Sequence, residues 1–367
     1  MNPATADDLR WLDAVVRYAQ PYRGTTGENP AVGALIVDPM TGVLIARAVT
    51  APGGRPHAAP QALDEAGEAA RGKTLYVTLE PSSHWGRTPP SVDTVIRAGI
   101  ARVVIGMADP DPRTDGKTIK RLIAAGIEVV LAGHLPSGRL HEGHTLRHRQ
   151  GRPFVTLKLA VSADGMIGEA VQGGFAIVGD EAGNWNDMLR SQSDAVLIGA
   201  ATAEADEPQL TVRLQGLERR TPLRVILSGA RGVDTKLNLI AGITGHRVAI
   251  ITTSDATLSA PASIEIIRVF GKGGRPDLVE ALGALSRKGI AHLLVEGGAQ
   301  LTEAFLASGL VDRFQLLSSD VVVGNKGIAA SVRGSIEQRL AAAQLVAVDL
   351  REIGNDVLRT FEKPADA

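Results

Sequence analysis

The segment "KTLYVTLEPSSHWGRTPPSVDTVIRAG", from Lys73 to Gly99, shows how the first half of this chain is built. The apolar run from Lys73 to Glu80 predicts a buried strand, a Pro-rich turn follows, and Ser91 to Gly99 predicts a short helix that ends at Gly. The pattern continues on both sides, with strands expected at 31–38, 101–107 and 126–133 and helices at 57–70 and near 115–125. Strands that alternate with helices predict an α/β sandwich with a largely parallel sheet.

The composition indicates a folded protein and excludes several partners. The length of 367 residues favours two domains, and 44% hydrophobic with 22% charged residues favours a buried core. The net charge of -1 gives no general field for nucleic acid or an anionic membrane, and no apolar run is as long as a membrane span. The N-terminus predicts an amphipathic helix rather than a signal segment. The absence of cysteine excludes disulfides and thiolate metal ligands. We therefore expect a soluble cytoplasmic protein.

A second α/β unit follows a polar stretch rich in His and Arg, from His134 to Pro153, which we interpret as the interdomain segment. We predict domains of residues 1–148 and 149–367. The run "FVTLKLAVSADG", beginning at Phe154, predicts the first strand of the second unit. Further strands are expected in the segments DAVLIGA, LRVILSG, HRVAIITT, IEIIRVF, AHLLVEGG and VDRFQLLSS.

Two segments of the first domain have the outline of a nucleotide-deaminase zinc site without its reactive groups. Such a site needs a His, a Glu two residues later that moves protons, and two Cys in a Pro-rich turn before a helix. Here His57 is present, Ala59 occupies the Glu position, and Ser82 and Ser91 occupy the Cys positions. A serine hydroxyl is a poor zinc ligand at neutral pH, and alanine cannot transfer a proton. The sequence therefore predicts that this domain binds no zinc and does not deaminate.

The motifs around these positions resemble the N-terminal deaminase domain of the bifunctional riboflavin-biosynthesis deaminase/reductase family. The segments NPAVGALIVD, PHAAPQAL, TLEPSSHWGRTPPS and the DPDP turn are similar to that family's NPxVGA, HAE, TLEPCSHxGRTPPC and DPxP motifs. The resemblance implies a cytidine-deaminase-like α/β/α sandwich with a degenerate site, retained for packing, assembly or ligand binding. It places His84 and Arg87 in a turn that could contact a nucleotide or could be a structured surface turn.

Three histidines in the presumed interdomain segment allow two interpretations. His141, His144 and His148 are spaced so that a helix would place them on one face, where three imidazoles could hold a metal. The alternative is a solvated, basic linker helix. The arginines around these histidines favour the linker, because they would repel a cation.

Two features of the second domain suggest a ligand site. Gly297 and Gly298 lie between a predicted strand and helix, where a helix N-terminus can bind phosphate, although many parallel sheets have such turns for packing alone. In "RSQSDAVLIGAATAEADEPQLTVR", Arg190 and Arg213 could clamp a phosphate or carboxylate, whereas either one alone could be a solvated surface residue.

The second domain resembles the reductase domain of the same family, which implies a dihydrofolate-reductase-like α/β fold. RPFVTLKLAVSADG, the run quoted above and VEGG carry this resemblance, which extends over nearly the whole chain. The residues implied to contact a phosphorylated ribosylaminopyrimidine are Arg190, Leu210, Arg213 and Glu296. Those implied to contact NADPH are Val161, Thr202, Asp206, Ser228, Gly229, Gly297 and Gly298. Asp206 is also a candidate proton donor, and a turn-forming role before Pro208 is an equal alternative.

The combined hypothesis is an NADPH-dependent reductase of riboflavin biosynthesis that carries a zinc-free, inactive deaminase domain. The resemblance implies reduction of the ribose of 5-amino-6-(5-phosphoribosylamino)uracil to a ribityl chain, by a homodimer built through the reductase domains. Two alternatives stay open. One is an NADPH-dependent reductase of a different ribosylated heterocycle or pteridine, and the other is a non-catalytic sensor of a flavin precursor or nucleotide. Gly174 and Ala176 replace the Ser and Trp of some family members, which leaves the cofactor affinity open.

Overall fold

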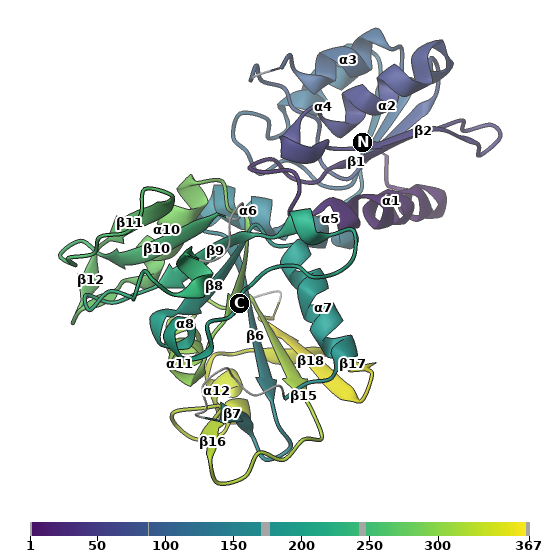
Figure 1. Ribbon diagram of the computed structural model, residues 1–367. Helices are drawn as coiled ribbons and strands as arrows, with labels where there is room; N and C mark the ends of the chain where they lie inside the picture. Colours follow the sequence, from purple (N-terminus) through teal and green to yellow (C-terminus); the bar gives the residue numbers. More distant parts are fainter. Residues whose placement is uncertain (1, 87, 170–176, 242–246, 365–367) are drawn as a thin grey trace. The chain divides into compact units, whose positions relative to one another are not determined.

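The computed structural model describes residues 2–86, 88–169, 177–241 and 247–364, so that Arg87, Gly174 and Ala176 lie outside the described residues. The chain divides into two compact units, Met1–Gly151 and Arg152–Ala367. Their boundary lies three residues beyond the one predicted after residue 148. Figure 1 shows the helices and strands of both units.

The first unit is a five-stranded sheet covered by helices. Its elements in chain order are α1 (Ala6–Ala19), β1 (Gly33–Val37), β2 (Leu44–Val49), α2 (Ala58–Ala66), β3 (Thr74–Val77), α3 (Ser91–Arg97), β4 (Arg102–Ile105), α4 (Lys117–Ala124), β5 (Glu128–Leu131), α5 (Leu135–Leu140) and α6 (Glu142–Gln150). The strands and helices predicted in this half of the chain are all present, and β2 is an additional strand that the sequence pattern did not indicate.

The sheet of the first unit has the order β2-β1-β3-β4-β5. β3, β4 and β5 are parallel, as expected for a largely parallel sheet, whereas β1 is antiparallel to both of its neighbours. The reason is the tight turn between β1 and β2. The N–H groups of Met40 and Gly42 donate to the side chain and carbonyl of Asp38 at 3.0 and 2.8 Å, and Gly42 has a φ of 68°. A turn this short can join only antiparallel strands.

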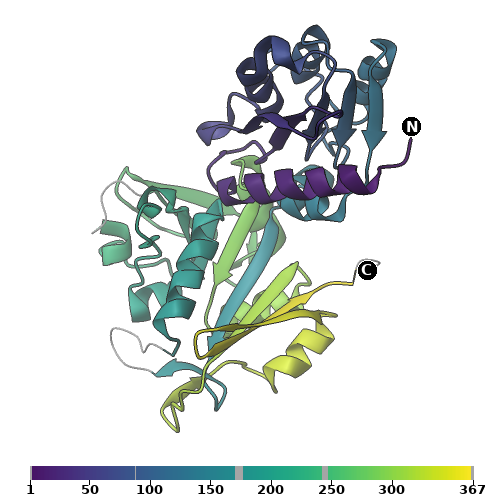
Figure 2. The same cartoon turned by 90° about the vertical axis from the view of Figure 1, so that its right-hand side faces the viewer.

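Helices cover both faces of this sheet, which confirms the predicted α/β/α sandwich. Leu12 and Val15 of α1 pack against one face, beside Tyr76 and Val104. α2, α3 and α4 bury a separate apolar cluster against the other face. α1 starts with a capping box at Thr5, and Figure 2 shows it lying along the sheet. The N-terminal segment predicted to be an amphipathic helix is therefore α1, and its apolar side packs against the sheet.

The stretch interpreted as an interdomain segment instead forms α5 and α6 of the first unit. His134, His141 and His144 in this stretch are buried. Their partners lie in the same unit, with Asp13 bonded to His134, Thr78 to His141 and Asp109 to His144. The interpretation as a solvated linker helix is therefore wrong, because these imidazoles are held by protein groups rather than by water.

The second unit is built around a nine-stranded sheet. Its elements are β6 (Phe154–Val161), β7 (Met166–Glu169), α7 (Asp180–Ser191), β8 (Ala195–Gly199), α8 (Ala200–Asp206), β9 (Leu223–Leu227), α9 (Asn238–Ala241), β10 (Val248–Thr253), β11 (Ile264–Val269), β12 (Gly271–Lys272), β13 (Arg275–Pro276), α10 (Leu278–Arg287), β14 (His292–Glu296), α11 (Ala299–Ala307), β15 (Arg313–Ser318), β16 (Gly327–Ala329), α12 (Ile336–Ala342), β17 (Val346–Ile353) and β18 (Asp356–Glu362).

The large sheet has the order β11-β10-β9-β8-β14-β6-β15-β18-β17. The strands from β11 to β15 are parallel, and the hairpin β17–β18 is added antiparallel at one edge. α10, α11 and α12 cover one face, and α8 and α9 cover the other. The seven strands predicted in this unit are all present. The sequence did not indicate the hairpin, because nearly every side chain of β17 is exposed or half-buried and the strand lacks a buried apolar run.

Candidate functional site

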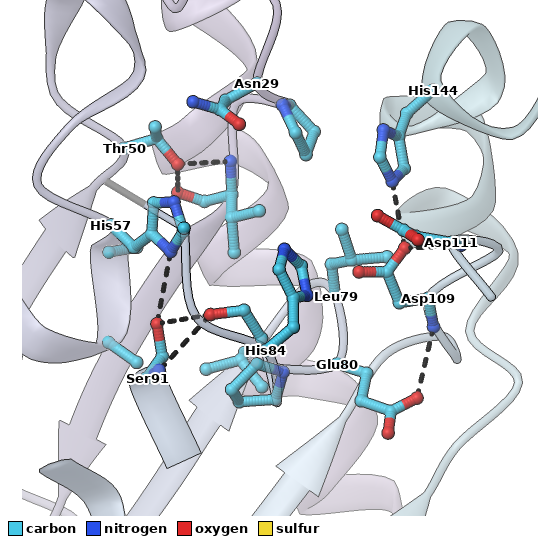
Figure 3. A pocket seen from close by; sticks show the side chains of 18 of the residues that line it. Asn29, Thr50, His57, Leu79, Glu80, His84, Ser91, Asp109, Asp111 and His144 are labelled. Atoms are coloured by element: carbon cyan, nitrogen blue, oxygen red, sulfur yellow. Dashed lines mark hydrogen bonds and ion pairs between the residues drawn. The ribbon is translucent and has the colours of Figure 1, made fainter. Parts of the chain in front are cut away.

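A cavity of about 300 Å³ in the first unit contains every described residue of the predicted vestigial site (Figure 3). These residues are His57, Ala59, Ser82, His84 and Ser91. The apolar part of the lining includes Val32, Val77 and Leu79. Further charged lining residues are Glu28, Arg55, Glu80, Asp109, Asp111, Arg113 and Arg147. The loop after β3, the start of α2 and the start of α3 therefore meet around one space, as the motif spacing predicts.

The residues at the metal-ligand positions bond to one another. His57 directly precedes α2, Ser91 is the first residue of α3, and Ser82 lies in the turn before α3. His57 Nδ1 lies 3.1 Å from Ser91 Oγ, and Ser82 Oγ donates to Ser91 Oγ at 3.1 Å. Burial, helped by the nearby charge of Arg55, lowers the pKa of His57 to about 4. The ring is therefore neutral at pH 7, and the cluster carries no net charge.

This donor set does not fit zinc. Structural and catalytic zinc sites use imidazole, thiolate or carboxylate ligands, and here one imidazole stands beside two neutral hydroxyls. Ala59 is 5% exposed and presents only a methyl group where a proton-transferring carboxylate would be required. Within the part of the chain that the structure describes, no group of three His, Cys, Asp or Glu side chains could hold a metal ion. No chemical step through zinc can be built from these residues.

The loops around the cavity are held in place by hydrogen bonds that require no metal. The Glu80 carboxylate accepts bonds from the backbone N–H groups of Asp109, Gly116 and Thr118 at 3.3, 3.1 and 3.1 Å. Asp109 in turn lies 2.9 Å from His144 Nε2. Burial raises the pKa of Glu80, although these donors oppose that shift. The family motif residues Glu80 and Asp109 thus fix the loops around the cavity and are already engaged within the protein.

The second candidate site is a cluster of paired charges between α7 and the end of β14. Arg190 donates from Nε and Nη2 to the two carboxylate oxygens of Glu296, at 2.6 and 2.9 Å. Its Nη1 donates to Asp187 at 3.1 Å. Asp187 also accepts a bond from the backbone N–H of Arg213 at 2.8 Å and lies 3.3 Å from its Nε. The structure therefore brings together three predicted substrate residues, Arg190, Arg213 and Glu296.

Lys158 is a member of this cluster that the sequence analysis missed. It lies on β6 directly opposite Glu296, and its side chain donates no hydrogen bond to any residue that the structure describes. Burial lowers the pKa of Lys158, and Arg190 acts in the same direction, although Glu296 opposes the shift. Burial acts to raise the pKa of Glu296, but Arg190, Lys158 and Asn186 together outweigh burial and hold the pKa of that carboxyl below its usual value. The signal was a lysine in the middle of an otherwise apolar strand, "FVTLKLAV".

The fourth predicted substrate residue, Leu210, has a strained backbone. Its φ is 54°, in the left-handed region that a leucine rarely adopts, and its side chain is buried. Glu207, the residue that follows α8, has a φ of 40°. Asp206 is the exposed last residue of α8, and partial burial raises the pKa of its carboxyl, which is the direction that a proton donor needs. The segment between α8 and Arg213 is thus held in an unusual conformation beside the charged cluster.

The residues predicted to contact NADPH lie at the carboxyl ends of adjacent parallel strands. Val161 ends β6, Thr202 follows β8, and Ser228 with Gly229 follows β9. Gly298 precedes α11, whose N-terminus has no side-chain cap, and a Cβ atom at Gly298 would have room 3.5 Å from Thr202 Oγ1. The carboxyl edge of a parallel sheet is where such folds bind ligands. At Gly297, by contrast, a Cβ would lie 2.8 Å from Leu301, so packing alone explains that glycine.

Comparison with known proteins agrees with the division of the chain into two units. Residues 153–359 match the family model described as "RibD C-terminal domain". The chain is 34% identical to "Riboflavin biosynthesis protein RibD" of Escherichia coli (strain K12), over 95% of this chain and 98% of that protein. It is 33% identical to the protein of the same description from Aquifex aeolicus (strain VF5), over 97% and 98%.

Two solved structures are similar over both units. "Acinetobacter baumannii RibD, form 1" has a TM-score of 0.84 and 29% identity, and the match covers 97% of this chain and 99% of that one. A diaminohydroxyphosphoribosylaminopyrimidine deaminase/5-amino-6-(5-phosphoribosylamino)uracil reductase from Thermotoga maritima gives the same TM-score, identity and coverage. The fold and these matches define a two-domain protein with a deaminase-like first unit and a reductase-like second unit. The chain belongs to the RibD family.

Proposed function

We propose that the protein is an NADPH-dependent reductase that acts on 5-amino-6-(5-phosphoribosylamino)uracil in riboflavin biosynthesis, with a first unit that neither binds zinc nor deaminates. The contrast between the two sites supports this proposal. The second unit brings the charged side chains of Lys158, Arg190 and Glu296 together. The deaminase-like cavity instead offers His57 with two serines and an alanine, which are neither metal ligands nor proton-transferring groups. A separate enzyme must then supply the deaminated substrate.

The reaction converts the substrate's ribose, opened to a Schiff base at C1′, into a ribityl chain. When bound, NADPH supplies the hydride that reduces this carbon. The protein holds the substrate, excludes water and provides protons. Glu296 accepts bonds from ring N–H groups or ribose hydroxyls, and Arg213, whose side chain is 69% exposed, can reach the phosphate. The Lys158 ammonium, which has a lowered pKa and no hydrogen-bond acceptor among the described residues, can donate a proton to the ring oxygen that leaves C1′.

The residues at the strand ends fit the proposed cofactor. The uncapped N-terminus of α11 offers backbone N–H groups and the positive end of a helix dipole, which suit a phosphate of NADPH. Thr202 and Gly298 would flank this position, and Val161, Ser228 and Gly229 would form the wall of the nicotinamide or ribose site. Asp206 stays a candidate for ordering the ribose.

The quaternary structure and the cellular location are also proposals. Among the described residues, no helix is both long enough and apolar enough to cross a membrane. We expect a homodimer in the cytoplasm. The edge strand β17 supports a dimer, because Val346, Val348 and Leu350 are exposed on the last strand of the sheet that the described residues form. Light scattering of the wild type and of the Leu350→Lys variant would test it, and a variant as large as the wild type would argue against this surface.

The direct test is NADPH oxidation by the purified protein with the deaminated pyrimidine and with its undeaminated precursor, assayed side by side. We expect oxidation with the deaminated compound only, no ammonia release from the precursor, and no zinc by elemental analysis. Oxidation with neither compound would overturn the proposal and favour a sensor or a reductase of another heterocycle. Ammonia release would show that the first unit is an active deaminase.

A further inference from the structure

Beside the pair of Arg190 and Glu296 lies a buried amide with an unused acceptor. Asn186 is 8% exposed, and its Oδ1 makes no hydrogen bond with any residue that the structure describes. Buried acceptors of this kind are nearly always paired, because leaving one unpaired costs the desolvation of the group. The exception at Asn186 therefore requires a reason, and its position next to the charged cluster suggests a ligand.

The orientation of this amide follows from its neighbour. Asn186 Nδ2 donates to Glu296 Oε2 at 3.2 Å. A carboxylate held ionised by Arg190 only accepts hydrogen bonds, so turning the amide over would set two acceptors against each other. Asn186 must therefore direct Nδ2 toward Glu296, which leaves Oδ1 as an acceptor with no partner.

Helix α7 places this acceptor within the proposed substrate site. Asn186 and Arg190 are four residues apart on α7, so both side chains lie on the same helix face and both reach Glu296. The guanidinium of Arg190 is already occupied by Glu296, Asp187 and the carbonyl of Thr211. Asn186 thus adds a neutral acceptor to a site whose cationic groups are tied to carboxylates.

We propose that Asn186 determines substrate specificity in the second unit, and that its Oδ1 accepts a hydrogen bond from an N–H of the heterocycle or an O–H of the ribose. This inference rests on the proposed reductase function. A site built to accept from such a group rejects analogues without it, because the buried oxygen is then left unpaired in the complex. Asn186 would therefore act on substrate affinity and not on the cofactor.

The test compares Asn186→Leu with Asn184→Leu. Leucine is close to asparagine in shape, and Asn184 is exposed on the same helix, which makes it a matched control. Each protein is assayed for NADPH oxidation with the phosphoribosylaminouracil, with an analogue methylated at a ring nitrogen and with a 2′-deoxyribosyl analogue. The melting temperature of each protein is measured without ligand.

For Asn186→Leu we expect the KM of the pyrimidine to rise about tenfold, with the KM of NADPH unchanged and the melting temperature equal to or above that of the wild type. In the wild type, one of the two analogues should lose about tenfold in kcat/KM, and that loss should disappear in Asn186→Leu. The analogue that behaves in this way identifies the donor group. Asn184→Leu should match the wild type throughout.

Two results would overturn the inference alone. One is a pyrimidine KM within twofold of the wild type, and the other is a lower melting temperature with unchanged KM, which would show that Asn186 only supports Glu296. A wild-type protein that oxidises no NADPH with the pyrimidine would overturn the proposed function, and this inference with it.

Discussion

The two candidate sites differ in the charge of their central side chains. The first unit has a cavity of about 300 Å³ whose central groups, His57, Ser82 and Ser91, are neutral and bond to one another. The second unit has ionised groups at hydrogen-bond distance, with Arg190 bonded to both Glu296 and Asp187. The proposed site of chemistry is therefore chosen by its side chains and not by the size of a cavity. What matters is which side chains carry charges or exchangeable protons.

The loops of the first unit are held in place without a metal. Glu80 and His144 hold the loops around the cavity through backbone N–H groups and Asp109. None of these bonds passes through the positions of a metal or its ligands. The loops around the cavity therefore do not depend on which residues occupy positions 57, 82 and 91, whereas in the second unit the charged side chains bond directly to one another.

The largest expected effect follows from breaking the charged cluster. Glu296→Ala leaves Arg190 and Lys158 buried without their main counter-ion, which should reduce the free energy of unfolding by about 3–5 kcal/mol and abolish NADPH oxidation. Glu303→Gln is the control, because Glu303 forms a partly buried ion pair with Arg339 away from this cluster. Denaturant unfolding and kinetics measure both quantities. A stable, active Glu296→Ala protein would contradict the importance of the cluster.

A second prediction would make the two sites more alike. The double substitution Ser82→Cys/Ser91→Cys would place two thiolates beside His57 Nδ1. The two hydroxyl oxygens that they replace are 3.1 Å apart, which is close to the distance of about 3.8 Å between two sulfur ligands of a tetrahedral zinc ion. We expect one zinc per chain by elemental analysis, and a gain of about 2.7 kcal/mol in stability at free zinc 100 times above Kd. Ser83→Cys/Ser91→Cys is the control and should bind none.

A chelator tests whether the wild type contains a functional metal. A chelator should leave its melting temperature and its NADPH oxidation unchanged, because the hydroxyl cluster has no metal to lose. A chelator that lowers either quantity would show that the wild type binds a functional metal after all.

A third prediction separates the two units by pH. His57 has a pKa of about 4 when folded and an ordinary value of 6.5, so the unfolded chain binds the proton first as the pH falls. The stabilisation is complete above pH 6.5 and is lost between pH 6.5 and 4; partial exposure of the ring limits it to about 2 kcal/mol. His141, with a pKa of about 3, acts in the same direction.

Hydrogen exchange read by mass spectrometry can follow each unit over this pH range. As the pH falls, amides of β1 and α2 in the first unit should lose protection at a higher pH than amides of β14 and β6 in the second unit. The His57→Gln variant should lose less protection between pH 7 and 4 than the wild type. Equal acid sensitivity of this variant and the wild type would argue against His57 as a contributor.

The smallest expected effect concerns Asp187. Asp187→Asn keeps the shape of the side chain but weakens its bonds to Arg213 and Arg190, so Arg213 should be less well ordered for the substrate. We expect the KM of the pyrimidine to rise about fivefold, which corresponds to about 1 kcal/mol, with little change in kcat. Asp180→Asn, at the exposed start of α7, should have no effect. A change in kcat alone would place Asp187 in the chemical step.

Much of the fold could be predicted because the apolar runs are continuous. Strands such as β8 and β14 are buried on both faces, and their sequences show it directly. The hairpin β17–β18 and the direction of β1 could not be predicted in this way. The apolar run of β1 indicated a strand but not its direction, and every side chain of β17 is exposed or half-buried. The buried histidines of α5 and α6 were misjudged for a related reason, because a polar stretch does not reveal which partners will bury it.

The sequence by itself determined that the first unit lacks a zinc ligand set, because the identities of Ala59, Ser82 and Ser91 decide what chemistry is possible. It also indicated the arginines and the glycine turn of the second unit. Only the tertiary structure showed that Lys158 and Asn186 join Glu296, and that Asn186 keeps an acceptor without a partner. These facts depend on which strand lies beside which and on how one helix face meets the sheet. Residues far apart in the chain gain their altered pKa values and unpaired atoms only once they are buried together.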